Sequence, residues 1–378
     1  MPLISSSSSY LYPFYAAWEN ALVGNIPSEI GYLKSLVFVS LEYGNITGTI
    51  PPEIGNIHAL REFWLSNNLM TGTLPPSMGT LRQLNTLALD DNGFTGDLLP
   101  VFGLGALEKV YLDDCGFDMM IDHGFFANCP NLVQLDASNN DLRGTLPLHL
   151  LHHSSLEVLD LHGNHLSGGF PLEILRQGKL SFLAVHGNNL TGPLPQSVSN
   201  LTGLNHLDVS HNSLTGTIPS ALVSLAELEY LFAGGNTFKK GGIPTFLGSL
   251  TGLRELSLKR SQRTGSIPNW IGNLTNLYLL DLDGNELVGT IPTSLGKLTG
   301  LFLLMLNRNH LTGTLPRDLK NLLTLGASFL LGYTDTRKKI YWYFGIGVSC
   351  IPDDTHCSLC LPYISTRLFS FSRDTHDR

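Results

Sequence analysis

A repeat of about 24 residues runs through most of this chain and constrains its fold more than any other feature. Segments such as SNNLMTGTLP, HGNNLTGPLP and DGNELVGTIP align on one shared position, and successive positions of this kind are 23 to 25 residues apart. A period held this closely predicts a stack of equivalent coils, because ordinary globular domains do not repeat. The thirteen marked positions are Asn20, Gly44, Asn68, Asn92, Cys115, Asn140, Asn164, Asn188, Asn212, Asn236, Ser261, Asn285 and Asn309.

A leucine pattern, LxxLxL, precedes the marked positions. In one coil it consists of Leu204, Leu207 and Val209. This alternation suits a short strand whose apolar residues line a core while their neighbours face solvent. One coil alone cannot bury its apolar side, so the coils must stack, with parallel strands about 4.8 Å apart and one core running down the stack.

Asparagine at the marked position has a physical reason. Its amide group both donates and accepts hydrogen bonds, so it can satisfy backbone groups of the tight turn in its own coil and in adjacent coils. Cys115 keeps a weak donor and Ser261 keeps a hydroxyl, whereas Gly44 keeps no side chain. We therefore expect the coil of Gly44 to be the least well bonded at this position.

The second half of each coil carries a more specific signature, seen as LTGTIPSALVSLAEL at 214–228 and LVGTIPTSLGKLTGL at 287–301. Through their Gly-x-Ile/Leu-Pro element, residues 12–316 resemble the plant-type leucine-rich repeats of receptor-like kinases and receptor-like proteins. Glycine permits the turn, and proline starts the next segment while removing a donor. The resemblance implies an α/β repeat solenoid: a right-handed superhelix with a parallel β-sheet on its concave face and 3₁₀ or loop segments on its convex face.

The repeat also sets the expected domain boundaries. We predict a disordered N-terminal segment at 1–11, a solenoid of about thirteen repeats at 12–332, and a poorly ordered, non-repeat tail at 333–378. The apolar stretches at 322–332 and 340–351 are each shorter than the roughly 18 to 20 residues that a membrane span needs. We therefore expect no direct membrane insertion from this chain.

Three coils depart from the repeat. The fifth coil, 115–132, lacks the Gly-x-Ile-Pro element and should bulge or bend the array. Single insertions before Pro100 and within 237–244 should widen the turns there.

Charge and motifs exclude several function classes. The net charge of -8 argues against a nucleic-acid or anionic-membrane surface, because both need clustered lysine and arginine. A charged partner should therefore be cationic. The sequence has no Ser-His-Asp signature, no GxSxG or GxxxxGK[ST] motif, and no dinucleotide fingerprint in a strand-to-helix context. We predict no enzymatic activity and no cofactor.

A candidate binding surface follows from the register. Residues four and two positions before each marked position form two outward-facing columns whose successive members should be neighbours in space. Stacked like charges in these columns destabilise a sheet, which favours a cationic or hydrogen-bonding ligand, although such residues can also simply keep an exposed sheet wet. The aromatic residues can anchor a ligand or be ordinary surface side chains. The predicted ligand-binding residues are Asp90, Asp113, Asp136, Asp160, His162, His186, His206, Asp208, His211, Trp64 and Tyr111.

The histidines and cysteines also raise the question of a metal site. Imidazole and carboxylate groups on adjacent strands can bind zinc or copper, but a sheet this flat encloses little, so we predict no metal. Cys357 and Cys360 form a single CxxC spacing, which we interpret as tail cysteines with no shared role. Cys129 aligns with core positions such as Leu81, so we expect it, like Cys115, to be a small buried hydrophobic residue.

We predict a non-enzymatic recognition scaffold that binds a peptide, protein or glycan ligand in signalling, with or without a co-receptor. Clustered histidines predict a pH dependence of binding between about 5 and 7. A structural or adhesive repeat protein without a dedicated ligand is the alternative.

The resemblance implies an extracellular or membrane-associated setting, whereas no signal peptide is visible, so a cytoplasmic setting stays open. If the chain is secreted, the Asn-x-Ser/Thr sites are Asn45, Asn189, Asn200 and Asn273.

Overall fold

The computed structural model describes residues 14–17, 20, 22–122, 124–174 and 178–322. The segment predicted to be disordered, the predicted tail and the predicted end of the solenoid at 332 lie outside these residues. The domain boundaries therefore stay predictions.

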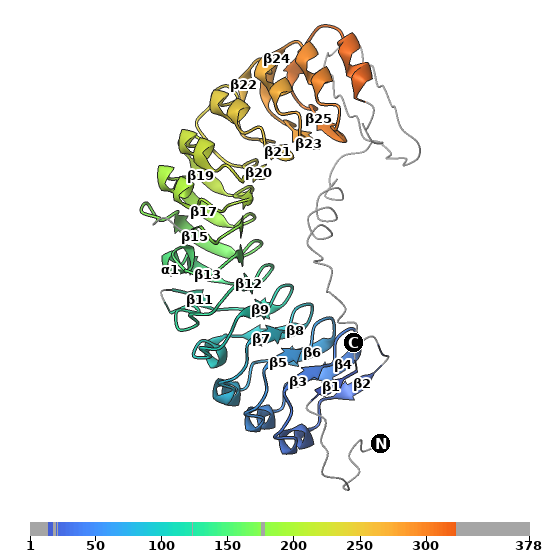
Figure 1. Cartoon of the computed structure of the whole chain (residues 1–378), viewed down its shortest axis with the longest axis vertical. Helices are drawn as coiled ribbons and strands as arrows, with labels where there is room; N and C mark the ends of the chain where they lie inside the picture. Colours follow the sequence, from blue (N-terminus) through green and yellow to red (C-terminus); the bar gives the residue numbers. More distant parts are fainter. Residues whose placement is uncertain (1–13, 18–19, 21, 123, 175–177, 323–378) are drawn as a thin grey trace.

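The coils stack into an arc whose inner side is one long parallel sheet (Figure 1). Each of its strands is three residues long and pairs in register with the strand of the next coil, so that Asp136 lies opposite Asp160, and Ala184 opposite Asp208. The predicted columns and the predicted solenoid are both confirmed. The strands are β1 (Phe14–Ala16), β3 (Phe38–Ser40), β5 (Glu62–Trp64), β7 (Thr86–Ala88), β9 (Lys109–Tyr111), β12 (Gln134–Asp136), β14 (Val158–Asp160), β16 (Phe182–Ala184), β18 (His206–Asp208), β20 (Tyr230–Phe232), β21 (Glu255–Ser257), β23 (Leu279–Asp281) and β25 (Leu303–Met305).

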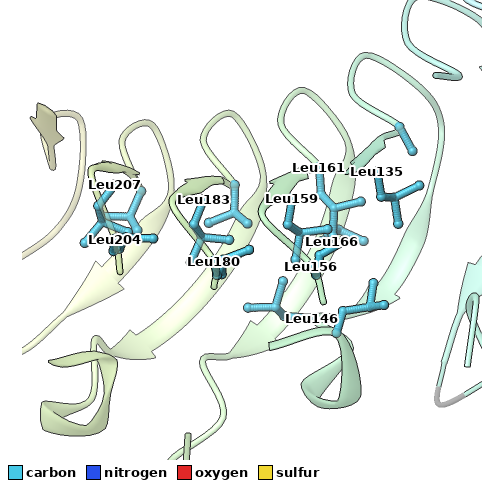
Figure 2. Close-up of a cluster of buried hydrophobic side chains, with 14 of the residues drawn as sticks. Leu135, Leu146, Leu156, Leu159, Leu161, Leu166, Leu180, Leu183, Leu204 and Leu207 are labelled. Atoms are coloured by element: carbon cyan, nitrogen blue, oxygen red, sulfur yellow. The ribbon is translucent and has the colours of Figure 1, made fainter. Parts of the chain in front are cut away.

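The interior is a continuous ladder of leucines. Leu156, Leu159 and Leu161 of one coil pack against Leu180 and Leu183 of the next, and all five are fully buried (Figure 2). Burying one such side chain contributes roughly 2 kcal/mol. Each coil can gain this only from its neighbours, so the stack holds together as a unit.

The asparagine ladder forms as predicted. In one coil, the Nδ2 group of Asn188 donates to the carbonyl oxygens of Leu161 (2.9 Å), Val185 (3.1 Å) and His186 (3.2 Å). Its Oδ1 atom accepts from the amide of Leu166 at 2.9 Å. The side chain thus satisfies backbone groups of two successive coils. The same four bonds recur at Asn68, Asn92, Asn140, Asn164, Asn212, Asn236, Asn285 and Asn309.

The substituted rungs behave according to their chemistry. The Sγ atom of Cys115 donates to the carbonyl of Leu89 in the preceding coil (3.4 Å). The hydroxyl of Ser261 donates only within its own coil, to Leu258 (2.6 Å). Gly44 contributes no side-chain bond, as expected.

Short helices cover the convex side. A proline at the N-cap keeps the backbone extended where the helix begins, as at Pro51 before η2 (φ -68°, ψ 138°). Neighbouring helices lie so close together that a Cβ atom added to Gly55 would be 2.5 Å from the carbonyl oxygen of Ser77. The 3₁₀ helices are η1 (Ser28–Tyr32), η2 (Pro52–Asn56), η3 (Pro76–Thr80), η4 (Leu99–Val101), η5 (Gln196–Asn200), η6 (Ser220–Ser224), η7 (Thr245–Ser249), η8 (Asn269–Asn273), η9 (Thr293–Lys297) and η10 (Arg317–Asn321); α1 (Leu148–Leu151) is an α-helix.

A second set of parallel strands runs along the side of the arc and is divided into three sheets. The first contains β2 (Val23–Asn25), β4 (Asn45–Gly48), β6 (Leu69–Gly72), β8 (Gly93–Gly96) and β10 (Gly116–Phe117); the second contains β11 (Met120–Ile121), β13 (Arg143–Thr145), β15 (His165–Gly169), β17 (Asn189–Pro193) and β19 (Ser213–Thr215); the third contains β22 (Thr264–Gly265), β24 (Glu286–Gly289) and β26 (His310–Leu311).

The divisions fall at two of the irregular coils. The fifth coil breaks the lateral sheet between β10 and β11, and the coil with the insertion at 237–244 breaks it between β19 and β22. The lateral sheet is thus interrupted at both places, whereas the bulge or bend predicted for the fifth coil and the wider turn predicted at 237–244 stay predictions. Before Pro100 the insertion leaves a helix, η4, of three residues where most coils have five.

Both irregular coils have side-chain contacts of their own. Phe125 and Phe126 of the fifth coil form a compact aromatic cluster with Phe102 of the preceding coil, with ring centroids 5.0 to 5.5 Å apart. In the second break Arg263 occupies the position that other coils give to a buried apolar residue. Its guanidinium donates to the carbonyls of Lys239 (2.8 Å) and Gly242 (3.4 Å), and these bonds add to the single parallel bridge that the backbone of Arg263 forms with Gly241.

Candidate ligand-binding surface

The outward residues of the inner sheet bring the predicted binding residues onto neighbouring strands. The column four residues before the marked position contains Trp64, Tyr111, Asp136, Asp160 and Asp208. The column two residues before it lies alongside and contains Asp90, Asp113, His162 and His186. The predicted residues therefore form one surface from β5 to β18.

An aromatic pair lies at the N-terminal end of this surface. The rings of Trp64 and Tyr111 stack with centroids 6.0 Å apart and an interplanar angle of 29°. They come from coils that are not adjacent, and they can meet because the intervening residue is the small, fully buried Ala88. The indole Nε1 group of Trp64 donates to Glu62 (3.0 Å), and the hydroxyl of Tyr111 donates to Gln134 (2.8 Å), so both rings are held in place.

Three carboxyl groups follow beside this pair. Burial raises the pKa of Asp90, although a hydrogen bond from the hydroxyl of Ser66 opposes the shift. Burial, with the charges of Asp136 and Asp90, raises the pKa of Asp113 to about 9. Burial and the charge of Asp160 raise the pKa of Asp136 to about 7, against the hydrogen bonds that Ser138 donates to it.

None of Asp90, Asp113 and Asp136 forms an ion pair with a lysine or arginine of residues 14–322 that the structure describes. When these carboxyl groups ionise, no cation of that part of the chain compensates their like charges, so their ionisation costs stability. A cation brought to this place would lower the pKa of all three carboxyl groups.

Two histidines pair with aspartates farther along the sheet. The Nδ1 group of His162 donates to Asp160 at 2.7 Å. The Nδ1 atom of His186 lies 3.2 Å from Asp208, close enough for an ion pair but without the alignment of a hydrogen bond. The two imidazole rings stack at 4.2 Å and 8°.

Their environments separate the two histidines electrostatically. Burial lowers the pKa of His162, but the hydrogen bond and charge of Asp160, with Asp136 and Asp208, outweigh it and raise the pKa overall. Burial lowers the pKa of His186 in spite of Asp208. Only His162 of this pair therefore gains protonation near neutral pH.

His206 differs from the expectation of an accessible histidine. Its ring lies between Phe182 (4.3 Å) and Tyr230 (5.5 Å) and close to Phe232 (5.5 Å), and the residue is only 8% exposed. Burial lowers its pKa to about 4, so it stays neutral between pH 5 and 7. It belongs to an aromatic row rather than to the titrating group. Phe182, which like His206 lies six residues before its marked position, was not among the predicted residues, most of which lie four or two residues before it.

His211 lies in the turn that follows β18. It is exposed, with a backbone φ of 50°. Burial and the charge of Lys259 lower its pKa. It therefore borders the surface and is a weaker candidate than His162.

Three of the predicted glycosylation sites, Asn45, Asn189 and Asn273, are exposed. The amide group of Asn200 donates to the carbonyl of Ile174 at 2.6 Å, so a glycan there would have to break that bond. Glycosylation at all four sites stays a prediction.

Cys129 is buried as predicted, whereas Cys115 is half-buried. Burial raises the pKa of the Cys115 thiol to about 12 and that of Cys129 to about 11, which makes both thiols unreactive. Cys357 and Cys360 lie outside the described residues. Among the described side chains, no group of three or more histidines, cysteines or carboxylates is arranged to hold a metal ion. The described helices are all too short or too polar to cross a membrane.

Comparisons with known proteins agree with this architecture. Leucine-rich-repeat family profiles match residues 179–238, and also 59–81, 155–176, 252–274 and 276–298. A comparison with curated protein sequences finds no significant match.

Several solved structures are similar to this chain. The PEPR1–AtPEP1 structure has a TM-score of 0.78 and 30% identity over 85% of this chain and 45% of that one. The ectodomain of the Arabidopsis thaliana receptor kinase GASSHO1/SCHENGEN3, in complex with CASPARIAN STRIP INTEGRITY FACTOR 2, has a TM-score of 0.72 and 31% identity over 83% and 40%. The Arabidopsis receptor kinase HAESA, with the peptide hormone IDA and the co-receptor SERK1, has a TM-score of 0.60 and 27% identity over 82% and 60%.

The chain thus spans from 40% to 60% of the length of these solved proteins. Leucine-rich repeats of this kind generally serve as non-catalytic binding scaffolds. The chain is a leucine-rich-repeat protein whose structure is close to the ectodomains of plant receptor kinases.

Proposed function

We propose that this protein is a receptor-like recognition module that binds an extended, cationic peptide along its inner sheet. The observation that carries the proposal is the position of the stacked Trp64–Tyr111 pair beside the uncompensated carboxyl groups of Asp90 and Asp113. We call these four residues the acidic aromatic surface.

The chemistry of this surface suits a basic side chain. An ammonium or guanidinium group over an aromatic face gains about 0.5 to 2 kcal/mol. The same cation would offset the repulsion between Asp90 and Asp113, so the ligand would relieve a cost that the free protein carries. Lysine and arginine can do both at once because their apolar stems pack on rings while their charged ends reach carboxylates.

The preference for a peptide rests on the shape of the sheet and on the similar structures. Among the similar structures, HAESA is in complex with the peptide hormone IDA, and the plant peptide hormone receptor RGFR1 is in complex with RGF2. A flat ribbon of parallel strands offers a long track and little enclosure, which fits an extended chain better than a compact small molecule. The proposal includes an extracellular or membrane-associated setting and the use of a co-receptor.

Fluorescence anisotropy with two labelled peptides of equal length tests the proposal. One peptide carries lysines and the other carries glutamates at the same positions. We expect the lysine peptide to bind and the glutamate peptide not to bind. Asp90→Asn combined with Asp113→Asn should weaken binding at least about tenfold, and so should Trp64→Ala.

The matched control is Asp281→Asn. Asp281 is also a buried aspartate of the inner sheet with a raised pKa, but it lies at the C-terminal end of the arc. This variant should bind the lysine peptide normally. Equal binding of the two peptides, or equal loss in all the variants, would rule out the proposed surface.

A further inference from the structure

We propose that the inner sheet has a second subsite, formed by Tyr230, Phe232 and Glu255, which binds an arginine side chain of the same peptide ligand. We call these three residues the arginine subsite. The inference rests on the proposed function, because it assumes a peptide that lies along the inner sheet. It goes further by specifying one residue of the ligand and the distance of that residue from the acidic aromatic surface.

A row of aromatic rings on the inner sheet ends at Glu255. Strand pairing places Phe182, His206, Tyr230, Glu255 and Leu279 side by side on the consecutive strands β16, β18, β20, β21 and β23. The rings of Phe182 and His206 stack at 4.3 Å, and those of His206 and Tyr230 at 5.5 Å. Tyr230 is half-buried, so part of its surface is open to a ligand. A flat group placed on Tyr230 would continue the stack and lie beside the carboxyl group of Glu255.

Glu255 is a buried carboxyl group without a partner. The residue is only 6% exposed, yet its carboxyl group accepts no hydrogen bond and forms no ion pair within the described part of the chain. Its neighbour Arg254 pairs with Glu229 instead, at 3.0 Å. Burial raises the pKa of Glu255. Since buried polar groups normally have hydrogen-bond partners, this carboxyl group is suited to a donor that a ligand supplies.

The next strand of the sheet carries a buried carboxyl group that already has its partners. Asp281 is 1% exposed, and its oxygens accept hydrogen bonds from the amide of Asp283 (3.0 Å) and the hydroxyl of Ser257 (3.3 Å). The positive charge of Lys259 also lowers the pKa of Asp281, against the effect of burial. Of these two neighbouring carboxyl groups, Glu255 is therefore the one that gains from a ligand.

Arginine fits this place better than lysine. Its guanidinium group is planar, so it can stack on the ring of Tyr230 while it donates two parallel hydrogen bonds to the carboxylate of Glu255. Its apolar stem would pack on Phe232, which is half-buried and lies two residues farther along β20. His206 does not repel this cation, because burial lowers the pKa of His206 to about 4 and keeps the ring neutral.

The two subsites set the spacing of the ligand. Six steps of the unbroken inner sheet lead from β9, the strand of Tyr111, to β21, the strand of Glu255 (Figure 1). At about 4.8 Å for each step this is roughly 29 Å. An extended peptide rises about 3.3 Å per residue, so it covers this distance in about nine residues. The arginine should therefore lie about nine residues from the basic residue at the acidic aromatic surface.

NMR titration of the full chain with two small probes tests the arginine subsite by itself. The probes are N-acetyl-arginine methylamide and its citrulline counterpart, which has nearly the same shape but no charge. We expect the ring signals of Tyr230 to report at least about tenfold tighter binding of the arginine probe. Glu255→Gln should remove this preference. The matched control Asp281→Asn should keep it, because the oxygens of Asp281 are already bonded within the sheet.

Equal binding of the two probes to the unmodified chain would overturn the inference, and so would equal loss of the preference in Glu255→Gln and Asp281→Asn. Circular dichroism checks that each variant folds. Phe232→Ala is a second variant, which keeps Glu255 and the ring of Tyr230 but removes the packing of the arginine stem. It should weaken the arginine probe about fivefold, and unchanged binding there would also count against the subsite.

Two longer peptides separate this inference from the proposed function. Each has a central lysine and, nine residues to either side of it, two arginines in one peptide or two citrullines in the other, so both chain directions are covered. If both proposals hold, the arginine peptide binds at least about tenfold more tightly, and Glu255→Gln removes the difference. Equal binding of the two peptides, with a loss for both in Asp90→Asn/Asp113→Asn, would reject the arginine subsite and leave the proposed function standing. Binding that is indifferent to Asp90→Asn/Asp113→Asn would reject the proposed function, while the small probes still report on Glu255.

Discussion

The inner sheet of this solenoid is unbroken through thirteen strands, whereas the lateral sheet on the same coils is divided into three. The two sheets depend on different parts of the repeat. The inner strands from β3 onward come from the LxxLxL pattern, and the irregular coils keep that pattern. Lateral strands depend on the turn after the marked position, which is where the sequence varies. The difference shows that the array tolerates irregular turns as long as the shared leucine core and the asparagine ladder continue from coil to coil.

The largest loss of stability should follow a substitution in the leucine core that the inner strands share. Leu183 is fully buried in β16, so Leu183→Ala should lower the free energy of unfolding by about 2 to 5 kcal/mol. Leu172 of the same coil is 72% exposed, and Leu172→Ala should change it by less than about 0.5 kcal/mol. Urea titration followed by circular dichroism compares the two. Equal effects would mean that the leucine ladder does not hold the inner sheet.

Removing an asparagine side chain from the asparagine ladder should cause the next largest loss of stability. Asn188→Ala removes four hydrogen bonds to the backbone of two coils, so we expect a loss of about 2 to 4 kcal/mol. The neighbouring Asn189 is exposed, and Asn189→Ala is the matched control with a loss below about 0.5 kcal/mol. Thermal unfolding of both variants measures this difference. A tolerant Asn188 would contradict the bonding role of the marked position.

The break at Arg263 allows a test confined to the lateral side. Arg263→Leu restores the usual apolar residue but removes the donors to Lys239 and Gly242. We expect amide hydrogen exchange of 239–242 to speed up about tenfold, with no change at β21. Faster exchange in β21 as well would show that the two sheets are not independent at this coil.

Most of the architecture could be predicted from sequence because a repeat turns one local rule into a global one. Marking Asn188 and its equivalents fixed the strand register, including the opposition of Asp136 and Asp160. The breaks could be located but not described, because nothing in the sequence shows that Arg263 would satisfy carbonyl groups in the loop before it. The accessibility of individual side chains could not be predicted either, because the burial of His206 depends on rings contributed by Phe182 and Tyr230 in neighbouring coils.

Removing an ionisable carboxyl group from the inner sheet should stabilise the folded protein. The pKa of Asp113 is about 9 in the fold, against 3.8 as its ordinary value, so the folded state holds this proton more tightly. The resulting cost to stability is absent below about pH 4 and grows as the pH rises toward 9. Asp113→Asn cannot ionise and should raise the free energy of unfolding by on the order of 1 kcal/mol at pH 8 and by little at pH 4. Denaturant titrations at the two pH values check this, and a loss of stability at pH 8 would contradict it.

The smallest effect concerns the pH response of the surface. Histidine titration by NMR should find His162 above its ordinary pKa of 6.5 and His186 below it, with His206 near 4. As the pH falls from 8 to 5, protonation of Asp136 removes negative charge from the inner sheet and protonation of His162 adds positive charge to it. Binding of the lysine peptide should therefore weaken by a few-fold, about 2 to 5 times. Stronger binding at pH 5 would reverse the electrostatic argument.

The most direct test of the central claim, that the unbroken inner sheet is the binding surface, is site-specific photo-crosslinking. A benzophenone amino acid in place of Lys109, an exposed residue of β9 beside Tyr111, is compared with one in place of Val223, an exposed residue of η6 on the convex side. We expect the lysine peptide to crosslink at position 109 and not at position 223. Crosslinking at 223 alone, or equally at both positions, would contradict the claim.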